Sequence, residues 1–348
     1  MSDGNNFDKW IQERKVKRRE FNASKLYEQL IKGDRVALGR SITLIESENQ
    51  QDRMEARKLL QLCLARNSSS KRIGITGVPG VGKSTFIESL GSMLVNLGYK
   101  IAVLAVDPSS AISGGSIMGD KTRMENLSKN EHVFVRPSPT GMNLGGVSKN
   151  TRETITLCEA AGYDFILIET VGVGQSETIV QSMVDLFLLL HLSGAGDELQ
   201  GVKRGIMELA DLIAITKVDG ENGQLAKIAK ANLTNALHLF PPKENLWIPK
   251  VLLTSAIENK GISELWETME QYFDSVLRQG WFDQNRKNQE LKVLEEHLVG
   301  LSNIYFQRNF EECKSIKNDY IQKILKGKIT GINAAEELFE KMIEKKRE

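Results

Sequence analysis

Nine consecutive residues, Gly77 to Thr85, read Gly-Val-Pro-Gly-Val-Gly-Lys-Ser-Thr and fit the pattern G-x-x-x-x-G-K-[S/T]. An apolar run precedes them, and a helical pattern begins at Lys83. In that setting glycines let backbone N–H groups surround phosphates, the lysine reaches the terminal phosphates, and the serine hydroxyl can bind Mg²⁺. The alternative is a chance glycine-rich turn, which requires neither the strand before it nor the helix after it. The segment predicts a phosphate loop with these candidate residues: Gly77, Gly80, Gly82, Lys83, Ser84 and Thr85.

Composition and charge narrow the choice of partners. The chain has 348 residues, of which 41% are apolar, so it can bury a large core. It carries 46 basic and 45 acidic side chains, for a formal charge of +1, and such a balance does not favour nucleic acid or an anionic membrane. The three cysteines are far apart, which is typical of reduced thiols. The first residues lack an apolar signal core, and the most apolar run, Leu186 to Leu192, is too short to span a bilayer. We expect a cytoplasmic protein.

The pattern along the chain divides it into three parts. Residues 1–66 have apolar positions at helical spacing and predict an N-terminal helical extension. Residues 67–280 alternate β-branched runs with helical stretches, the pattern of an α/β, doubly wound and mainly parallel sheet of the P-loop NTPase type. Residues 281–348 predict a helical arm. The expected strands are Arg72–Thr76, Lys100–Asp107, Val133–Arg136, Phe165–Glu169, Leu186–His191, Leu212–Thr216 and Lys250–Thr254.

The C-terminal arm has one apolar stripe. Leu291, Leu294, Leu298 and Leu301 follow one another at spacings of three, four and three residues, which places them on one helix face. Such a stripe either packs back on the core or meets a copy of itself, and its coiled-coil-like spacing favours a homodimer.

The nucleotide base is indicated by a second motif. The predicted strand that ends at Thr216 continues as Lys217-Val218-Asp219, a T-K-x-D element. The Asp219 carboxylate can accept hydrogen bonds from the two adjacent guanine donors, a pair that adenine lacks. The aliphatic part of Lys217 would cover the base, and Ser255 and Ala256 would add a backbone contact. The spacing from the phosphate loop predicts GTP and GDP rather than ATP.

Three acids are candidates for a Mg²⁺ site, because this ion prefers oxygen ligands. Asp107 and Glu169 each close a predicted strand beside the phosphate loop, and Asp120 lies in a glycine-rich loop. Ser84 would complete the set, and the alternative for each acid is a helix cap or a solvated loop position. Gln175 is a candidate for orienting the attacking water, and Lys121 for neutralising charge in the transition state.

Several stretches together resemble one family. They are Gly77–Thr85, Val106–Ser110, Ser113–Met124, Arg136–Pro139, Glu169–Glu177 and Gly194–Gly201. The set is similar to the MeaB/ArgK family of GTPases, the chaperones of adenosylcobalamin-dependent methylmalonyl-CoA mutase. The resemblance covers residues 40 to 280 approximately. It implies a slow GTPase that gates cofactor loading, protection or off-loading on a B12-dependent acyl-CoA mutase, and it implies a homodimer.

The resemblance also assigns a role to a loop that the residues alone describe only as polar and glycine-rich. Asp197, Gln200 and Lys203 correspond to the loop that relays the nucleotide state to the mutase. Which mutase is the partner stays open. Two other functions remain as alternatives: a GTPase that delivers a metal to another metalloenzyme, and a kinase that phosphorylates a small metabolite. The scattered histidines and the T-K-x-D element respectively argue against them.

Overall fold

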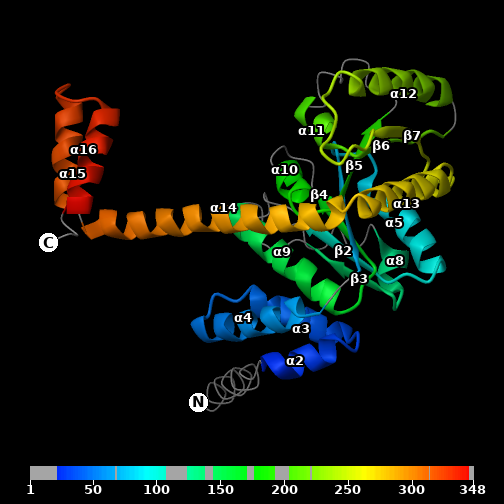
Figure 1. Ribbon diagram of the computed structural model, residues 1–348, viewed down its shortest axis with the longest axis horizontal. Helices are drawn as coiled ribbons and strands as arrows, with labels where there is room; N and C mark the ends of the chain where they lie inside the picture. The colour runs from blue at the N-terminus through cyan, green and yellow to red at the C-terminus, as the bar shows by residue number, and fades with distance from the viewer. Residues whose placement is uncertain are drawn as a thin grey trace, which may run out of the picture. The chain divides into compact units, whose positions relative to one another are not determined.

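The computed structural model describes residues 22–66, 69–106, 124–137, 144–170, 176–192, 204–219, 222–312 and 314–344. Two compact units divide between Asp283 and Gln284. The first unit is built on a seven-stranded parallel sheet of order β3-β2-β4-β1-β5-β6-β7 (Figure 1). The strands are β1 (Lys71–Gly77), β2 (Ile101–Val106), β3 (Val133–Arg136), β4 (Phe165–Thr170), β5 (Leu186–Leu192), β6 (Leu212–Thr216) and β7 (Lys250–Leu253). All seven predicted strands are confirmed, each with ends within one residue of the expected ones.

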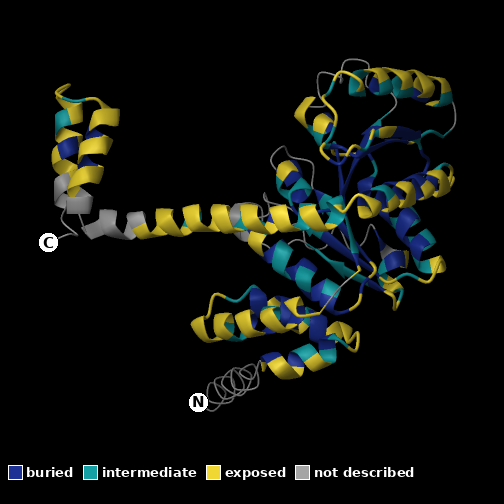
Figure 2. Ribbon diagram, viewed as in Figure 1, coloured by how far each residue is buried: buried dark blue, intermediate teal, exposed yellow. Residues whose placement is uncertain are grey.

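The strands are apolar throughout because helices cover both faces of the sheet. Alternate residues of β2 illustrate this: Ile101 and Val103 belong to one core cluster, while Ala102, Leu104 and Val106 belong to another. The first cluster includes apolar residues of α5 (Lys83–Asn96), α8 (Glu125–Lys129) and α13 (Ile262–Arg278). The second includes residues of α9 (Leu144–Ala160) and α10 (Ser176–Gln181). A third cluster lies between β5, β6 and β7 on one side and α11 (Arg204–Leu209) and α12 (Gly223–Leu237) on the other. Figure 2 shows the strands buried inside these layers.

Within the predicted N-terminal extension, the described residues 22–66 are mainly helical and form part of the first unit. It contains α2 (Ala23–Leu30), α3 (Arg35–Ile45) and α4 (Gln50–Leu64). Each helix begins after a residue whose side chain accepts a hydrogen bond from a free backbone N–H of the first turn: Asn22, Asp34 and Asn49. The apolar faces of these helices join the cluster that contains α9, and an ion pair links Glu46 to Arg136 at the end of β3.

Three aspartates form hydrogen bonds that join neighbouring segments at the edge of the sheet where the strands begin. Asp164, Asp185 and Asp211 stand immediately before β4, β5 and β6. The backbone N–H of each donates to a neighbouring backbone carbonyl, and its carboxylate accepts from the N–H of that same neighbouring residue. For Asp211 this neighbour is Phe187, with donor–acceptor distances of 2.8 Å and 2.9 Å. The corresponding neighbours are Lys100 for Asp164 and Arg72 for Asp185. Each reciprocal pair satisfies a backbone N–H at a place where the strand ladder would otherwise stop.

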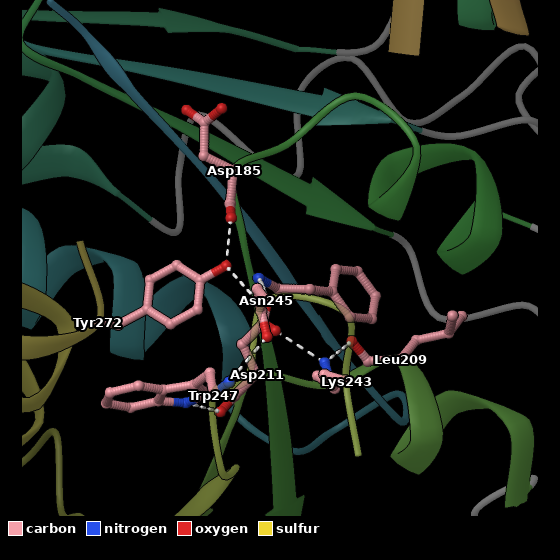
Figure 3. A network of polar contacts seen from close by, with 8 residues as sticks. Asp185, Leu209, Asp211, Lys243, Asn245, Trp247 and Tyr272 are labelled. Carbon is pink, nitrogen blue, oxygen red and sulfur yellow. Dashed lines mark hydrogen bonds and ion pairs between the residues drawn. The ribbon is translucent and has the colours of Figure 1, made fainter. Parts of the chain in front are cut away.

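The same edge holds a buried polar network that fixes α13 and the segment before β7 (Figure 3). The Asp211 carboxylate pairs with Lys243 at 2.7 Å, and its backbone carbonyl accepts from the Trp247 indole N–H at 3.0 Å. The Tyr272 hydroxyl donates to the Asp185 carbonyl at 2.7 Å. Burial is the main reason why the pKa of Tyr272 is raised well above its ordinary value. The network therefore contains a neutral phenol and one ion pair.

The second unit is helical. It comprises α14 (Trp281–Glu312) from Gln284 onward, α15 (Lys314–Leu325) and α16 (Gly331–Glu344). Tyr320, Ala334 and Leu338 form the core between α15 and α16, and the Tyr320 hydroxyl lies 3.0 Å from Glu337. The apolar stripe of α14 is at least half exposed at each of its four leucines. No helix among the described residues has the length and apolar character needed to cross a membrane.

Candidate nucleotide site

The phosphate loop connects β1 to α5 at the edge where the strands end. Its backbone requires glycine at two positions. Gly82, which caps α5, has a φ of 97°, in the left-handed region that a side chain disfavours. A Cβ on Gly77 would lie 2.6 Å from the Leu190 carbonyl oxygen of the neighbouring strand β5. The loop therefore passes close to the sheet and delivers the N-terminus of α5 to the edge, where its N–H groups favour anions.

Lys83 is a buried cation within this loop. Its ammonium donates to the Gly77 carbonyl at 2.8 Å and to the Val78 carbonyl at 3.3 Å. Only 8% of the residue is exposed. Carbonyl oxygens are weak partners for a buried ammonium compared with an ionised phosphate oxygen. The phosphate contact of Lys83 stays a prediction, and its position inside the loop is compatible with it.

Ser84 and Glu169 lie together, although 85 residues separate them in the sequence. Their side chains are joined by a hydrogen bond of 3.4 Å from the serine hydroxyl to a carboxylate oxygen. The sheet causes this contact, because β1 and β4 are neighbours and Ile75 is in register with Glu169. A hydroxyl and a carboxylate are the kind of ligands that Mg²⁺ accepts, so these two residues fit the predicted metal site. Within the described ranges, no group of three or more His, Cys, Asp or Glu residues is placed to hold a metal ion.

The predicted guanine element lies beside the phosphate loop. Lys217, the first residue after β6, has a φ of 58°, and its ammonium donates to the Gly80 carbonyl at 2.7 Å. Its side-chain Cε would lie 3.8 Å from a Cβ built on Gly82. The Val218 N–H donates to the Thr254 carbonyl at 3.2 Å, which joins the T-K-x-D element to the loop after β7. Two segments that the sequence places far apart therefore form one wall of the site.

Ser255 and Asp219, two of the predicted guanine-site residues, belong to the segments that form this wall, and Lys260 lies with them without having been predicted. Ser255 and Lys260 exchange backbone hydrogen bonds of 2.9 Å and 3.0 Å across a tight turn that contains Ala256. The Lys260 ammonium pairs with Glu258, and this hydrogen bond raises its pKa, with a smaller contribution from the charge of Asp219. A single lysine in a polar turn carries no motif, so the sequence offers no signal for it.

Thr216 is a second residue that the sequence does not assign. Its buried hydroxyl lies 2.8 Å from the Val81 carbonyl of the phosphate loop and 3.3 Å from the His191 carbonyl of β5. It thus connects the end of β6 to the loop one residue before Gly82. The available signal is its place directly before Lys217 in the T-K-x-D element.

Seven predicted site residues lie outside the described residues. They are Asp107, Asp120, Lys121, Gln175, Asp197, Gln200 and Lys203. The structure therefore brings together the phosphate loop, Glu169 and the guanine element, and leaves the predicted catalytic and relay residues as predictions.

Comparison with known proteins gives a consistent set of matches. Residues 38–304 match the family model described as methylmalonyl-CoA mutase-associated GTPase MeaB. A protein of Mycobacterium tuberculosis named "Probable GTPase" is 52% identical over 74% of this chain and 77% of its own length. The mouse protein named "Methylmalonic aciduria type A homolog, mitochondrial" is 46% identical over 84% of this chain and 71% of its own. A crystal structure described as a LAO/AO transport system kinase superposes with a TM-score of 0.75, at 34% identity, over 91% of this chain and 96% of that one.

Proposed function

The chain belongs to the MeaB family of methylmalonyl-CoA mutase-associated GTPases, and from this premise we propose that it is a slow GTP-hydrolysing switch acting on a B12-dependent acyl-CoA mutase. Its proposed task is to gate the loading, protection or off-loading of adenosylcobalamin on that enzyme. Methylmalonyl-CoA mutase is the proposed partner, in keeping with the description of the family.

One observation carries the proposal: the phosphate loop, Glu169 and the T-K-x-D element meet at a single edge of the sheet. Ser84 contacts Glu169, and Lys217 contacts Gly80, so the elements proposed for phosphates, metal and base share one loop. This arrangement suits a nucleotide that lies along the loop with its phosphates at the N-terminus of α5.

The predicted site residues have distinct proposed tasks in GTP hydrolysis. Lys83 binds the terminal phosphates, and Ser84 and Glu169, with Asp107 and Asp120, hold Mg²⁺, which neutralises phosphate charge when bound. Asp219 reads guanine, the stem of Lys217 covers it, and the backbone at Ser255 and Ala256 borders it. Two further residues complete the proposed catalytic group. Gln175 orients the attacking water, and Lys121 neutralises charge in the transition state.

Partner control is proposed for the loop that holds Asp197, Gln200 and Lys203. A switch changes its partner only if the two nucleotide states differ in their contacts with it. This loop directly follows β5, which is paired with β1 along the strand that leads into the phosphate loop. The pairing of β5 with β1 supports the proposal that this loop responds to the nucleotide.

Homodimer formation is proposed for α14. Its four stripe leucines are between 50% and 60% exposed within the second unit, and a contiguous apolar stripe of this kind gains free energy when a second copy covers it. Analytical ultracentrifugation of the full chain tests this proposal, with Leu294→Glu and Leu298→Glu expected to shift a dimer toward the monomer.

The function is tested by GTP hydrolysis, measured with the purified chain alone and with methylmalonyl-CoA mutase, with ATP as the control nucleotide. Stimulation by the mutase that is specific for GTP supports the proposal. Slow GTP hydrolysis that no B12-dependent acyl-CoA mutase changes would retain the GTPase and refute the assigned partner.

Two variants separate the parts of the proposal. Lys83→Ala removes the phosphate contact and is expected to abolish measurable hydrolysis. Asp219→Asn exchanges an acceptor for a donor, so the preference is expected to move from GTP toward xanthosine triphosphate. Unchanged base selectivity in Asp219→Asn would mean that guanine is recognised elsewhere.

A further inference from the structure

A cavity lies at the edge of the sheet where the strands begin, opposite the edge that holds the phosphate loop. It has a volume of about 280 Å³ and is bordered by the turn between α2 and α3, the residue before β2, the turn between α8 and β3, and the turn between α9 and β4. This volume is near the lower end of the range for small-molecule sites, about 300 to 1,000 Å³. The cavity is one strand length from the phosphate loop. The six residues of β2 correspond to roughly 20 Å, so a ligand here does not share the nucleotide's phosphate site.

Two cations in the wall of this cavity form no ion pair with an acid among the residues that the structure describes. Lys100 forms neither an ion pair nor a side-chain hydrogen bond with the part of the chain that the structure describes. Its ammonium would lie 3.9 Å from a Cβ on Gly33, so it is directed toward the turn between α2 and α3. The Arg35 guanidinium donates to the Asn130 carbonyl at 3.2 Å and, within the same described ranges, pairs with no carboxylate. Most of its five N–H groups remain available.

The acids near this cavity make contacts other than ion pairs with Lys100 or Arg35. The Asp164 carboxylate accepts from the Lys100 backbone N–H, and the Asp34 carboxylate accepts from the first turn of α3. Glu131 lines the cavity, but its side chain is 88% exposed and lies 3.8 Å from the His132 ring. Lys100 and Arg35 are exposed as well, so solvent and salt screen the charge of Glu131 and of both cations.

Tyr163 adds a hydrogen-bond donor to the same wall. The residue is only 6% exposed, and its hydroxyl has no hydrogen-bond partner among the described residues. Burial raises the pKa of this phenol to about 12, although the nearby charge of Arg35 acts in the opposite direction. The hydroxyl therefore keeps its proton at neutral pH and can donate to an anion.

We propose that this cavity is a second ligand site, which binds the phosphate group of a small metabolite through Lys100, Arg35 and Tyr163. A planar guanidinium fork, a compact ammonium and a neutral phenol together match the several acceptor oxygens of a phosphate monoester. A carboxylate has two oxygens and would leave more of these donors without a partner. The cavity leaves room for a compact organic group beside the phosphate.

The test uses inorganic phosphate as the probe. Binding is measured by isothermal titration calorimetry at constant ionic strength, with the full chain saturated with GDP and Mg²⁺ so that the phosphate loop is filled. We expect saturable binding that Lys100→Gln and Arg35→Gln each weaken roughly fivefold or more, and Tyr163→Phe weakens about twofold to threefold. Glu131→Gln is expected to strengthen binding, because it removes the negative charge from the cavity wall.

A matched control is available in the turn between α2 and α3. Lys32 stands next to Gly33, is exposed and does not line the cavity, so Lys32→Gln changes the net charge by the same amount without changing the site. It is expected to leave phosphate binding unchanged, and unaltered GDP affinity in every variant verifies that each has folded.

Three outcomes would overturn the proposal. The first is no saturable phosphate binding. The second is binding that Lys100→Gln and Lys32→Gln weaken equally, which would indicate a general charge effect. The third is tighter binding of malonate than of phosphate with the same dependence on Lys100, which would make the site one for carboxylates.

Discussion

Thr216→Val tests whether the end of β6 holds the phosphate loop in place. Valine has nearly the same shape as threonine and replaces the hydroxyl with a methyl group, so the substitution removes hydrogen bonding without opening a cavity. A hydroxyl has one hydrogen, and the shorter of the two contacts, 2.8 Å to the Val81 carbonyl, is the one expected to dominate.

The magnitude follows from burial. Thr216 is 5% exposed and Val81 is fully buried, so the Val81 carbonyl loses a partner that water does not readily replace. The hydrogen bond itself contributes about 0.5 to 1.5 kcal/mol, and an unsatisfied buried acceptor raises the cost to about 1 to 3 kcal/mol. Val81 is followed by Gly82 and α5, so a less firmly held loop also has to be ordered by the nucleotide. We expect the affinity for GDP to fall by up to tenfold, equivalent to about 1.4 kcal/mol.

The assay combines chemical denaturation, which gives the free energy of unfolding, with a fluorescence titration of a labelled GDP analogue. Thr216→Ser is the control, because it keeps the hydroxyl and deletes a buried methyl group. It should lose about 1 kcal/mol of stability while retaining GDP affinity. Thr216→Val with unchanged GDP affinity and a stability change below about 0.5 kcal/mol would refute the reasoning.

Three further predictions concern the scaffold. Gly261→Ala should lower the free energy of unfolding by at least about 2 kcal/mol in a denaturant titration, because its φ is 72° and a Cβ would overlap the Leu253 carbonyl oxygen; a neutral effect would contradict this. Asp211→Ala should lower the free energy of unfolding by about 2 to 4 kcal/mol in the same assay, because the buried N–H of Phe187 and the ammonium of Lys243 both lose their carboxylate partner. A loss below about 1 kcal/mol would mean that water replaces both contacts. Burial raises the pKa of the Cys63 thiol to about 12, and it raises the pKa of the Cys158 thiol as well. At pH 8 neither thiol should therefore react with a disulfide reagent until denaturant is added. Rapid modification of all three cysteines in the native protein would contradict this.

The strands could be predicted from the sequence because each is a short apolar run bounded by polar or glycine-containing segments. The run Leu186–Leu192, for example, is almost entirely buried, as a strand covered on both faces must be. The phosphate loop and the T-K-x-D element could be predicted because their chemistry requires particular residues at fixed spacing. Their mutual contact at Lys217 depends on strand order, which residue patterns alone do not specify.

Thr216, Lys260 and the cavity near Lys100 could not be predicted, for a common physical reason. Thr216 and the cavity depend on contacts between segments far apart in the chain, and Lys260 reaches the site only because the loop after β7 contacts Val218; none uses a residue type that is unusual for its position. The contact between Ser84 and Glu169 could be predicted only in part. Each residue was predicted as a magnesium ligand, but their contact depends on the parallel pairing of β1 with β4.

The two edges of the sheet are closed by different side chains, and the choice at the carboxyl edge fits the phosphates proposed to bind there. Where the strands begin, aspartate carboxylates satisfy the free N–H groups, as in the pair of Asp211 with Phe187. Where they end, buried threonine hydroxyls connect neighbouring segments, as in the contact of Thr216 with Val81 and the 2.8 Å contact between Thr76 and Thr170.

Hydroxyl groups close the carboxyl edge without adding negative charge next to bound phosphates. Carboxylates in the same places would repel the phosphates at short range, where burial makes charge interactions strong. Glu169 departs from this pattern where its carboxylate accepts a hydrogen bond from Ser84, the predicted magnesium ligand. An acid is favourable there only if a cation lies between it and the phosphates. The neutral threonines at positions 76, 170 and 216 therefore support the proposal that Glu169 serves the metal and not the scaffold.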